Sequence, residues 1–574
     1  MRRDVAALES LTFDVAVVGG GIHGAWIALR AARAGLCVVL LERGDFGAGT
    51  SANSLRIVHG GLRYLQHLDL ARMRRSIAAR RAFCRESPHL VAPLPCLLPL
   101  QGAGVRSPWL LGPALVANDV VAWDRNRGVA IAARLPRGRL LGAAECRRRL
   151  APLVDLRASA GALWWDAIAL DPARLALEPV LAAAELGAAV ANRLEARALL
   201  LAGGRVHGVV AVDRVARRDV EIRADVVVDA TGPGGGRLAT LAGLAAPYRP
   251  PRWVGALNLV LGRRLALEGG VALGAASRRA DGSAWVKRAT RELFFVPHGA
   301  TTLVGTDYLT CDDDADPAAP PHDLIARFLD EAAGVAPRAE LTAKDVVATH
   351  WGLLPAEDVA PDVPRKSPTL VAGADAAGAA GLVVAIGEKL TSAPDLSARV
   401  LACVRRELGT RRGATVARLA PAPHGRTQPH EWIPPSCDAA VEARLRRRYG
   451  TRWLQVAAHA DGPEGLQAIA PGTDVRGVEI LHALREEMAL GLDDLVLRRL
   501  GLGDAGHPGA AVLDACAAAA ARELGWSEPA RRAAVAALDQ AFEVSRTGLG
   551  ASSPSRTYHA SVRASPVATS MRGA

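Results

Sequence analysis

The chain has 574 residues, half of them hydrophobic, which is too long for a single core and predicts two or three domains. Its net charge of +12 does not indicate a nucleic-acid partner, because the arginines are spread through every region and only four lysines occur. The eight cysteines include no C-x-x-C pair, which argues against a disulfide framework or a zinc site and favours a reduced, cytoplasmic setting.

The pattern of apolar residues predicts neither a signal peptide nor a membrane-spanning segment. The first residues carry no long apolar stretch, and no uncharged apolar run reaches the length that crosses a bilayer. Two basic stretches, residues 72–81 and 444–449, are interpreted as solvated helix faces, with contact to an anionic membrane surface as the alternative.

Residues 13–42 predict a strand, a glycine turn, a helix and a second strand, in that order. Gly19, Gly21 and Gly24 form G-x-G-x-x-G, in which the first two glycines let the backbone approach a pyrophosphate and the third lets the helix pack on the strand. The second strand ends at Glu42, which is placed to accept hydrogen bonds from a ribose. The segment therefore predicts a dinucleotide site, and NAD and FAD are both open at this point.

Two further segments narrow the choice of cofactor. Residues 45–51 form a hydroxyl-bearing loop, and residues 59–65, HGGLRYL, place two glycines beside Arg63 and Tyr64, which suits a backbone lying against a flat ring. Together these segments resemble the FAD-dependent glycerol-3-phosphate dehydrogenase family of the D-amino-acid-oxidase-like superfamily, whose members carry a GGGINGAG-like turn, a GDFASGTSS-like loop and HGGLRYL. The resemblance covers about residues 12–545 and implies FAD as the cofactor.

Later segments agree with this resemblance. A strand over 224–229 ends in Ala-Thr-Gly, where the glycine permits close approach to a cofactor, and short strands between 250 and 365 predict an antiparallel sheet over the substrate. Residues 381–396 predict a strand, a glycine turn and a helix start, and they match the family's GGKxTT. The acidic run 312–314 is interpreted as a solvated turn, and no metal site is predicted.

The predicted fold class is α/β: a two-dinucleotide-binding-type FAD fold with a parallel sheet, an inserted antiparallel substrate-binding sheet and a C-terminal all-α domain. The discontinuous FAD-binding domain is expected at residues 12–100, 155–245 and 366–410. The substrate-binding cap is expected at 101–154 and 246–365, the helical domain at 430–545, and a disordered tail at 546–574.

The residues expected to contact FAD lie in the matching segments and in the loops beside them: Gly19, Gly21, Ile22, Gly24, Glu42, Arg43, Thr50, Ser51, His59, Gly60, Gly61, Thr231, Gly232, Gly387, Lys389, Leu390 and Thr391.

The resemblance also implies a reaction. In the family, sn-glycerol 3-phosphate is oxidised to dihydroxyacetone phosphate as a hydride passes to flavin N5, and the electrons go on to quinone. By position, Arg63 and Tyr64 line the substrate side, Lys389 lies near the flavin or a substrate oxygen, and Arg365 is a second basic contact. The resemblance further implies a cytoplasmic protein peripheral on the inner face of the membrane, and a homodimer is a possible assembly.

Three residues depart from the family pattern in or beside the substrate site. Leu354 stands where an arginine grips the phosphate, Asn258 stands where a histidine handles the substrate proton, and Glu388 replaces the second glycine of GGK. Asparagine does not titrate near neutral pH, so the base has to come from elsewhere. The nearby histidines that could replace it are His59, His298 and His350.

These departures leave two other functions open. One is an FAD-dependent dehydrogenase or oxidase of a non-phosphorylated alcohol or an amine, and the other is a flavin-binding protein without turnover.

Overall fold

The computed structural model describes residues 1, 3–101, 107–156, 158–244, 252–276, 290–311, 320–358, 363–373, 378–409, 437–460 and 462–547. The acidic run 312–314 and the predicted tail beyond Thr547 lie outside the described residues, and so does the side chain of Arg63.

The first of two sheets carries the predicted strand–helix–strand unit. Its strands run in the order β16-β17-β10-β1-β2-β7, and β10, β1, β2, β7 and β17 pair in parallel, as a sheet buried on both faces requires. A hairpin of β8 and β9 extends β10, with its turn at Gly203 and Gly204. The strands are β1 (Thr12–Val18), β2 (Val38–Leu41), β7 (Ala189–Ala191), β8 (Leu194–Ala202), β9 (Arg205–Asp213), β10 (Arg218–Asp229), β16 (Thr369–Ala372) and β17 (Leu382–Ile386).

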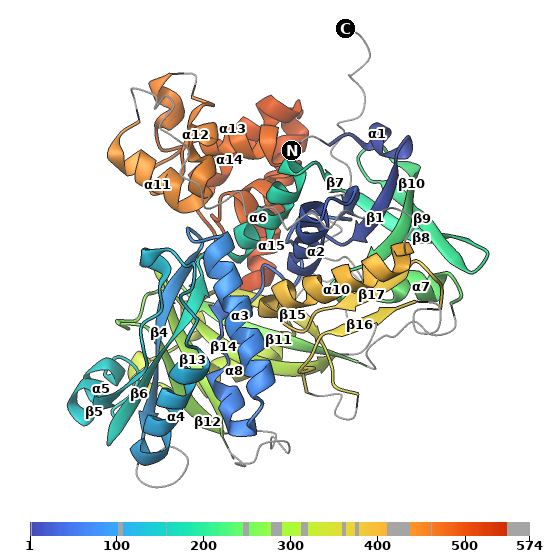
Figure 1. Ribbon diagram of the computed structural model, residues 1–574. Coiled ribbons are helices and arrows are strands. Elements are labelled where there is room, and N and C mark those ends of the chain that lie inside the picture. The colour runs from blue at the N-terminus through green and yellow to red at the C-terminus, as the bar shows by residue number, and fades with distance from the viewer. Residues whose placement is uncertain are drawn as a thin grey trace.

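Helix α2 packs against both α6 and α10 beside this sheet (Figure 1). Helix α2 (Ile22–Arg33) begins at the glycine turn and ends before Gly35, whose positive φ of 79° permits the left-handed turn into β2. Helix α6 spans Pro172–Glu185. Helix α10 spans Ala393–Leu408 and follows the glycine turn at residues 387–391, which we call the closing turn. The predicted α/β cofactor fold is therefore confirmed.

The second sheet is largely antiparallel and runs in the order β15-β11-β14-β13-β12-β4-β6-β3, with β5 paired to β6. Its strands are β3 (Ile57–Val58), β4 (Val91–Leu100), β5 (Arg139–Gly142), β6 (Ala160–Ala169), β11 (Trp253–Leu261), β12 (Gly270–Ala276), β13 (Thr290–His298), β14 (Thr301–Cys311) and β15 (Val346–Pro355).

The sheets divide the chain differently from the boundaries expected at residues 100 and 155. Strands β4 and β6 pair with each other over ten residues and belong to the second sheet, although both were expected in the FAD-binding domain. The sequence did not reveal this because both strands are almost wholly buried, and a continuous apolar run looks the same in either sheet.

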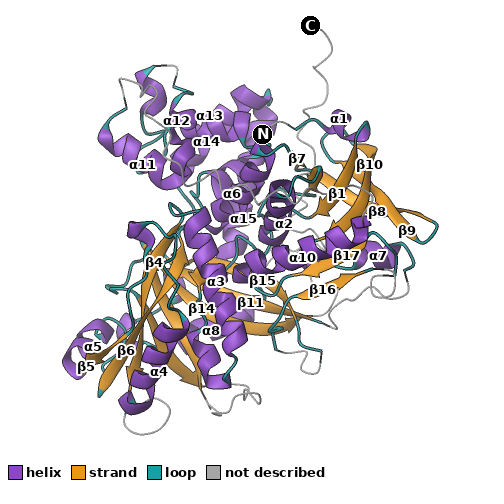
Figure 2. Ribbon diagram, in the orientation of Figure 1, coloured by secondary structure: helices purple, strands orange, loops and turns teal. Residues whose placement is uncertain are grey.

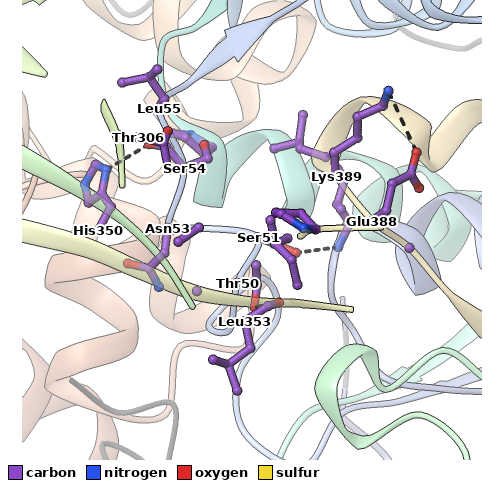
Figure 3. A pocket seen from close by; sticks show the side chains of 18 of the residues that line it. Thr50, Ser51, Asn53, Ser54, Leu55, Thr306, His350, Leu353, Glu388 and Lys389 are labelled. Carbon is purple, nitrogen blue, oxygen red and sulfur yellow. Dashed lines mark hydrogen bonds and ion pairs between the residues drawn. The ribbon is translucent and has the colours of Figure 1, made fainter. Parts of the chain in front are cut away.

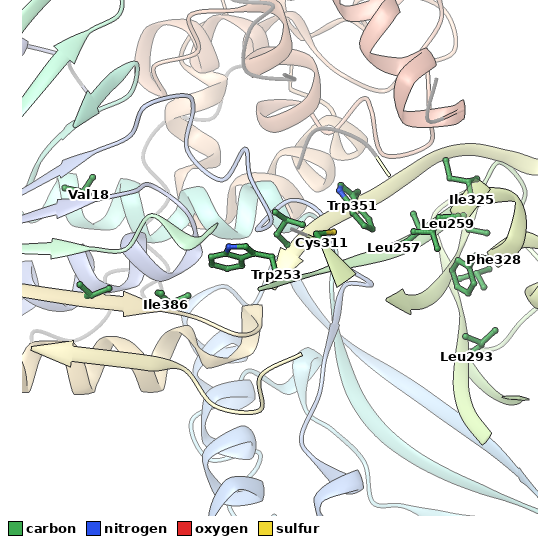
Figure 4. Packing of buried hydrophobic residues seen from close by; sticks show 14 of the residues in the cluster. Val18, Trp253, Leu257, Leu259, Leu293, Cys311, Ile325, Phe328, Trp351 and Ile386 are labelled. Atoms are coloured by element: carbon green, nitrogen blue, oxygen red, sulfur yellow. The ribbon is translucent and has the colours of Figure 1, made fainter. Parts of the chain in front are cut away.

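One hydrophobic core joins the two sheets. It runs from Val18 and Ile386 in the first sheet to Trp253, Leu257 and Phe328 at the second (Figure 4). Because this core is continuous, the strand ends of the first sheet face the second sheet across a fixed distance.

The C-terminal helices gather at one end of the two sheets, except for the last of them, which packs against β15 of the second sheet (Figure 2). They are α11 (Ala439–Tyr449), α12 (Trp453–Ala457), α13 (Gly477–Glu486), α14 (Ala510–Leu524) and α15 (Glu528–Thr547). Helix α13 ends at Glu486, and a π-helical turn follows at Asp494–Arg499.

That π-helical turn attaches the helical domain to the FAD-binding part. Arg498 and Arg499 both bind the buried carboxylate of Asp45 at 2.7 Å, and Arg174 of α6 binds Glu487 at 2.6 Å. Removing one partner of such a buried pair leaves an uncompensated charge, so these contacts fix the position of the domain.

The remaining helices cover the second sheet and the outer edges: α1 (Val5–Glu9), α3 (Leu70–Glu86), α4 (Pro108–Val121), α5 (Ala143–Leu150), α7 (Arg237–Leu241) and α8 (His322–Val335). Within the described ranges, none of the helices combines the length and the apolar character that crossing a bilayer needs.

Candidate active site

A single cavity of about 2390 Å³ lies between the two sheets and collects most of the predicted site residues. The predicted residues that line it are Gly19, Gly21, Ile22, Glu42, Arg43, Thr50, Ser51, His59, Gly61, Tyr64, Thr231, Gly232, Asn258, Arg365, Gly387, Lys389, Leu390 and Thr391. Gly24 and Gly60 are not among the lining residues: Gly24 gives room to Gly19 in the cavity wall, and Gly60 gives room to Arg80 behind it.

The glycine turn is closely packed against the end of β10. A Cβ on Gly19 would lie 2.6 Å from the carbonyl oxygen of Ala230, and a Cβ on Gly24 would lie 1.8 Å from that of Gly19. Gly19 also has a φ of 107°, which side-chain-bearing residues rarely adopt. These positions therefore accept glycine alone, and the N-terminus of α2 is left open toward the cavity.

Glu42 stands at the end of β2 and lines the cavity beside this turn. Its two carboxylate oxygens accept hydrogen bonds from the backbone N–H groups of Gly20, at 2.6 Å, and Gly44, at 2.7 Å. Burial raises its pKa despite these bonds. Since a carboxylate has about four acceptor positions, Glu42 keeps capacity for a ribose hydroxyl.

The loop after Glu42 links the glycine turn to the second sheet (Figure 3). The hydroxyl of Ser51 accepts the N–H of Ile22 at 2.9 Å, and the hydroxyl of Thr50 donates to the carbonyl of Leu353 in β15 at 3.3 Å. Gly352 makes this approach possible, because a Cβ there would lie 2.7 Å from the Thr50 side chain.

Asp166 of β6 fixes the turn formed by His59, Gly60 and Gly61. Its carboxylate lies 3.0 Å from Nδ1 of His59, accepts the N–H of Gly60 at 2.7 Å, and pairs with buried Arg80. Although burial opposes it, His59 and Arg80 lower the pKa of Asp166. A Cβ on Gly60 would lie 2.1 Å from the Arg80 guanidinium, so a side chain there would displace this arginine from Asp166.

His23 was missed by the sequence reasoning. It lies on the first turn of α2, and its Nε2 is 3.0 Å from the hydroxyl of Ser392 after the closing turn. Burial lowers its pKa to about 4. A Cβ on Gly387 would lie 2.0 Å from the His23 ring, so this glycine is required by contact with a helix from the other end of the chain. The sequence feature that could have indicated this contact is the presence of a polar residue, His23, inside the glycine motif.

Tyr64 and Lys389 meet in the cavity although 325 residues separate them. Nζ of Lys389 donates to the Tyr64 hydroxyl at 2.8 Å, and the guanidinium of Arg72 lies 4.5 Å from the centre of the Tyr64 ring. Burial alone would raise the pKa of Tyr64, but Lys389 and Arg72 together lower it. Arg72 also lines the cavity, and the sequence had given it no role in the site.

Glu388 adds a buried carboxylate next to this pair. Its Oε1 is 3.8 Å from Nζ of Lys389, and its Oε2 has no hydrogen-bond partner within the described part of the chain. Burial raises the pKa of Glu388. The site thus holds both a cation and an acid at the closing turn.

Asn258 lies on β11, directly opposite His350 on β15. Its side-chain oxygen accepts the hydroxyl of Thr306 at 2.7 Å, while Nδ1 of His350 lies 2.9 Å from the carbonyl oxygen of Ser54 (Figure 3). That contact puts the proton on Nδ1 and leaves Nε2 as an acceptor. Burial, together with Arg56, lowers the pKa of His350 to about 4, so its ring is neutral at pH 7.

The remaining predicted substrate residues differ in whether their side chains line the cavity. Leu354 lines the cavity from β15, and Arg365 lines it while binding the hydroxyl of Thr369 at 2.7 Å and the carboxylate of Asp358. The backbone of Arg63 lies in a short helical turn at Leu62–His67, and its side chain is outside the described residues. Among the other candidate histidines, His59 and His350 line the cavity, and His298 contacts Arg56 at 2.7 Å.

The residues present fit an FAD. The open N-terminus of α2, the acceptor at Glu42, and Gly232, whose φ is 61° and whose Cβ direction is empty, leave room for a dinucleotide along the wall of the cavity. The closing turn at residues 387–391 completes the same wall.

Comparison with known proteins agrees with this geometry. Residues 14–402 match the FAD dependent oxidoreductase family, and residues 396–531 match the C-terminal domain of alpha-glycerophosphate oxidase. The chain is 27% identical over 530 residues to a glycerol-3-phosphate dehydrogenase of Synechocystis, covering 87% of this chain and 90% of that one. It is 29% identical over 527 residues to a protein of the same name from Mycobacterium leprae, covering 90% and 85%.

A solved structure shares the fold over nearly the whole chain. The glycerol-3-phosphate dehydrogenase of Bacillus halodurans, complexed with FAD, aligns with a TM-score of 0.68 at 21% identity and covers 95% of this chain and 97% of its own. With the family match spanning residues 14–402 and a cavity built for a dinucleotide, the chain belongs to the FAD-dependent oxidoreductases and has a C-terminal helical domain of the alpha-glycerophosphate oxidase type.

Proposed function

We propose that this protein oxidises sn-glycerol 3-phosphate to dihydroxyacetone phosphate at its FAD and passes the electrons to a quinone or another acceptor. The observation that carries the proposal is the cationic surround of Tyr64, where Lys389 bonds the hydroxyl and Arg72 covers the ring. A phosphate dianion is bound by charge-assisted hydrogen bonds from such groups. Arg365 and Lys366 line the same cavity and add to its positive charge.

Each side chain takes a defined part in this reaction. When bound, FAD accepts the hydride from the substrate carbon. Lys389 and Tyr64 hold a substrate oxygen by hydrogen bonds, and Arg63 and Arg365 are proposed as further substrate contacts.

His350 is proposed as the base that takes the hydroxyl proton. Residues directly opposite on antiparallel strands point to the same face, so His350 lies beside the position where the family places its histidine and this chain has Asn258. Its ring is neutral at pH 7 and keeps Nε2 as an acceptor, which a proton-accepting group requires. Asn258 is then proposed to orient the substrate hydroxyl and not to accept its proton.

The test is to follow flavin bleaching without oxygen as single compounds are added to the purified holoprotein. Prompt bleaching by sn-glycerol 3-phosphate, with its enantiomer and glycerol far slower, supports the proposal. Bleaching by glycerol at the same rate contradicts it, because the cations around Tyr64 would then contribute nothing to recognition.

A second candidate substrate is a non-phosphorylated alcohol or an amine. It is favoured by the unpartnered Oε2 of Glu388, which would accept from an ammonium group, and by apolar Leu354 at the cavity wall. Reduction by an amine but not by sn-glycerol 3-phosphate would select this candidate. If no compound of either class bleaches the flavin, the protein is a flavin-binding protein without turnover.

For the wider setting, we propose a cytoplasmic protein that attaches peripherally to the membrane where its acceptor resides, with a homodimer as the assembly to test.

A further inference from the structure

Arg56 is a buried cation close to His350, and the proposed reaction gives it no part. Its side chain is 1% exposed, it lines the cavity, and it lies immediately before β3. Its φ of 64° is in the left-handed region, which residues other than glycine seldom adopt. Backbone strain of this kind, held in place beside a reaction site, points to a role in the reaction.

The guanidinium of Arg56 is held by an acid from the helical domain. Its Nη2 donates to Oδ1 of Asp504 at 2.8 Å, and its Nη1 donates to Oδ2 at 3.1 Å. Nη1 also donates to the carbonyl oxygen of Leu170 at 3.0 Å. Asp504 follows the π-helical turn that attaches the helical domain. This ion pair therefore joins the two domains at the cavity, and its two hydrogen bonds fix the plane of the guanidinium.

The third contact of Nη1 is with a histidine, and it determines where the proton of that ring lies. Nη1 is 2.7 Å from Nε2 of His298, at the end of β13. Arginine has only donors, so Nε2 of His298 has to accept, and the proton of the ring is on Nδ1. The acceptor nitrogen of His298 is therefore occupied, and His298 does not line the cavity. Arg56 thus removes one of the three histidines that the sequence offered as a base.

Arg56 is connected to a second histidine, His350, through Ser54. The hydroxyl of Ser54 accepts the N–H of Arg56 at 3.2 Å, and the carbonyl oxygen of Ser54 lies 2.9 Å from Nδ1 of His350 (Figure 3). Because one residue makes both contacts, a displacement of Arg56 would move the carbonyl that keeps the proton of His350 on Nδ1. Nε2 of His350, a residue of the cavity wall, is thereby left as an acceptor.

The charges around His350 favour its neutral ring. The charged and titratable groups that face it are Arg56, Asp504 and His298, and Asn258 lies opposite it on β11. Burial is the main cause of the low pKa of His350, and the positive charge of Arg56 comes next. The negative charge of Asp504 acts in the opposite direction and has the smaller effect. The ion pair thus fixes Arg56 without cancelling its influence on the ring.

We propose that Arg56 and Asp504 are positioning residues that select His350 as the base. Arg56 occupies Nε2 of His298 and holds the loop that leaves Nε2 of His350 as an acceptor, and Asp504 fixes Arg56 from the helical domain. The helical domain thereby influences the proton transfer through Arg56. The inference rests on the proposed function only for the role of His350 as the base, because the arrangement of the two rings can be measured without substrate.

The first experiment records nitrogen chemical shifts from holoprotein with isotope-labelled histidines. These shifts show which nitrogen of a ring carries the proton, and the signals are assigned from His298→Gln and His350→Gln. We expect the proton on Nδ1 of both rings in the unaltered protein. In Arg56→Met, Nε2 of His298 loses its donor and faces Oδ2 of Asp504 at 3.8 Å. The signal of Nε2 of His298 should then become that of a protonated nitrogen.

The second experiment measures the pH dependence of flavin reduction. Without the charge of Arg56, the pKa of His350 should rise from about 4 toward its ordinary value of 6.5. The loss of rate at acid pH should therefore begin about one pH unit higher or more in Arg56→Met. Adding Asp504→Asn to this variant removes the unpaired acid and should move the loss back toward lower pH. Arg56→Lys keeps the charge and should leave the loss near pH 4.

The matched control is an ion pair of the same kind away from the cavity. Arg33 binds Glu86 through two hydrogen bonds, of 2.9 and 2.7 Å, and neither residue lines the cavity. Arg33→Met with Glu86→Gln should leave both ring signals and the pH dependence unchanged. Flavin absorbance and the unfolding temperature confirm that each variant is folded. Arg56→Gln, which removes the charge but keeps a donor, provides the same pH test if Arg56→Met does not fold.

Two results would overturn the inference. One is an unprotonated Nε2 of His298 in folded Arg56→Met, and the other is a pH dependence that does not move or that moves equally in the control pair. The ring signals need no substrate. Failure of sn-glycerol 3-phosphate to bleach the flavin would therefore contradict the proposed function and not this arrangement of the histidines.

Discussion

The two ends of the cavity differ in what determines their shape. At the cofactor end the shape depends on the absence of side chains: Gly19, Gly24 and Gly387 each lie against atoms that a Cβ would overlap. At the substrate end the shape depends on side-chain contacts such as Lys389 with Tyr64 and Thr306 with Asn258. The first end tolerates almost no substitution, whereas the second can exchange one side chain for another and change its substrate.

The largest effect is therefore expected from a single methyl group at the cofactor end. Gly24→Ala would place a Cβ 1.8 Å from the carbonyl oxygen of Gly19 and force the glycine turn apart. We expect the purified variant to lack flavin absorbance and to unfold at a lower temperature. Gly334→Ala in α8 is the control, because its Cβ would meet nothing within 4 Å and it does not line the cavity, so the variant should retain FAD. Full flavin content in Gly24→Ala would refute the steric account.

At the substrate end, His350→Gln tests the proposal that His350, and not the residue at position 258, accepts the substrate proton. If His350 takes the proton, the rate of flavin reduction should fall by about 10²-fold to 10⁴-fold, which is the contribution of a positioned general base. The exposed His207→Gln in β9 should have no effect. An unchanged rate would show that another group accepts the proton. His59 is then the next candidate, because it lines the cavity and is held by Asp166.

The pH dependence of the unaltered protein follows from the same residue. The folded pKa of His350 is about 4, below the ordinary value of 6.5, so the unfolded chain binds more protons between these values. The contribution to stability is thus fully present above about pH 6.5 and is lost as pH falls through 4. The reduction rate should be level near neutral pH and fall only as pH approaches 4, and a fall near pH 6.5 would contradict the burial of this base.

Lys389→Met should have the next largest effect. It removes the donor to Tyr64 and the cation that does most to lower the pKa of that hydroxyl, so the rate of flavin reduction should drop by about 10²-fold to 10³-fold. Lys344→Met, at an exposed position, is the control. FAD content should stay normal in both variants, and loss of flavin from Lys389→Met would show that the lysine serves the cofactor end.

The contrast between the two ends also explains what the sequence could predict. The order of strand, glycine turn, helix and acid is local, so residues 13–42 alone predict a dinucleotide site, although not which dinucleotide it binds. The contacts of His23 with Ser392 and of Tyr64 with Lys389 join segments hundreds of residues apart, and no local pattern contains them.

Charge patterning was the least reliable guide. The basic stretch 72–81 suggested a surface, yet Arg80 is buried and its neighbours bind Asp124, because an arginine run cannot be assigned to solvent until its acidic partners are known. The exposed apolar side chains of α4, such as Trp109 and Val116, were overlooked for the opposite reason, since an apolar helix is normally assigned to a core.

The smallest effect, and the one that bears most directly on the substrate, is expected from Leu354→Arg. Leu354 lines the cavity at the position where the resemblance implies a phosphate-binding arginine, and Leu354→Arg is expected to add a charge-assisted hydrogen bond to a phosphate. The KM for sn-glycerol 3-phosphate should fall about tenfold, with Leu354→Met as the volume-matched control. If the natural substrate carries no phosphate, the same change should leave its KM unchanged or raise it, because a guanidinium would then be desolvated without a partner. The two proposed substrates therefore predict opposite responses to one substitution at the end of the cavity that side chains, and not glycines, define.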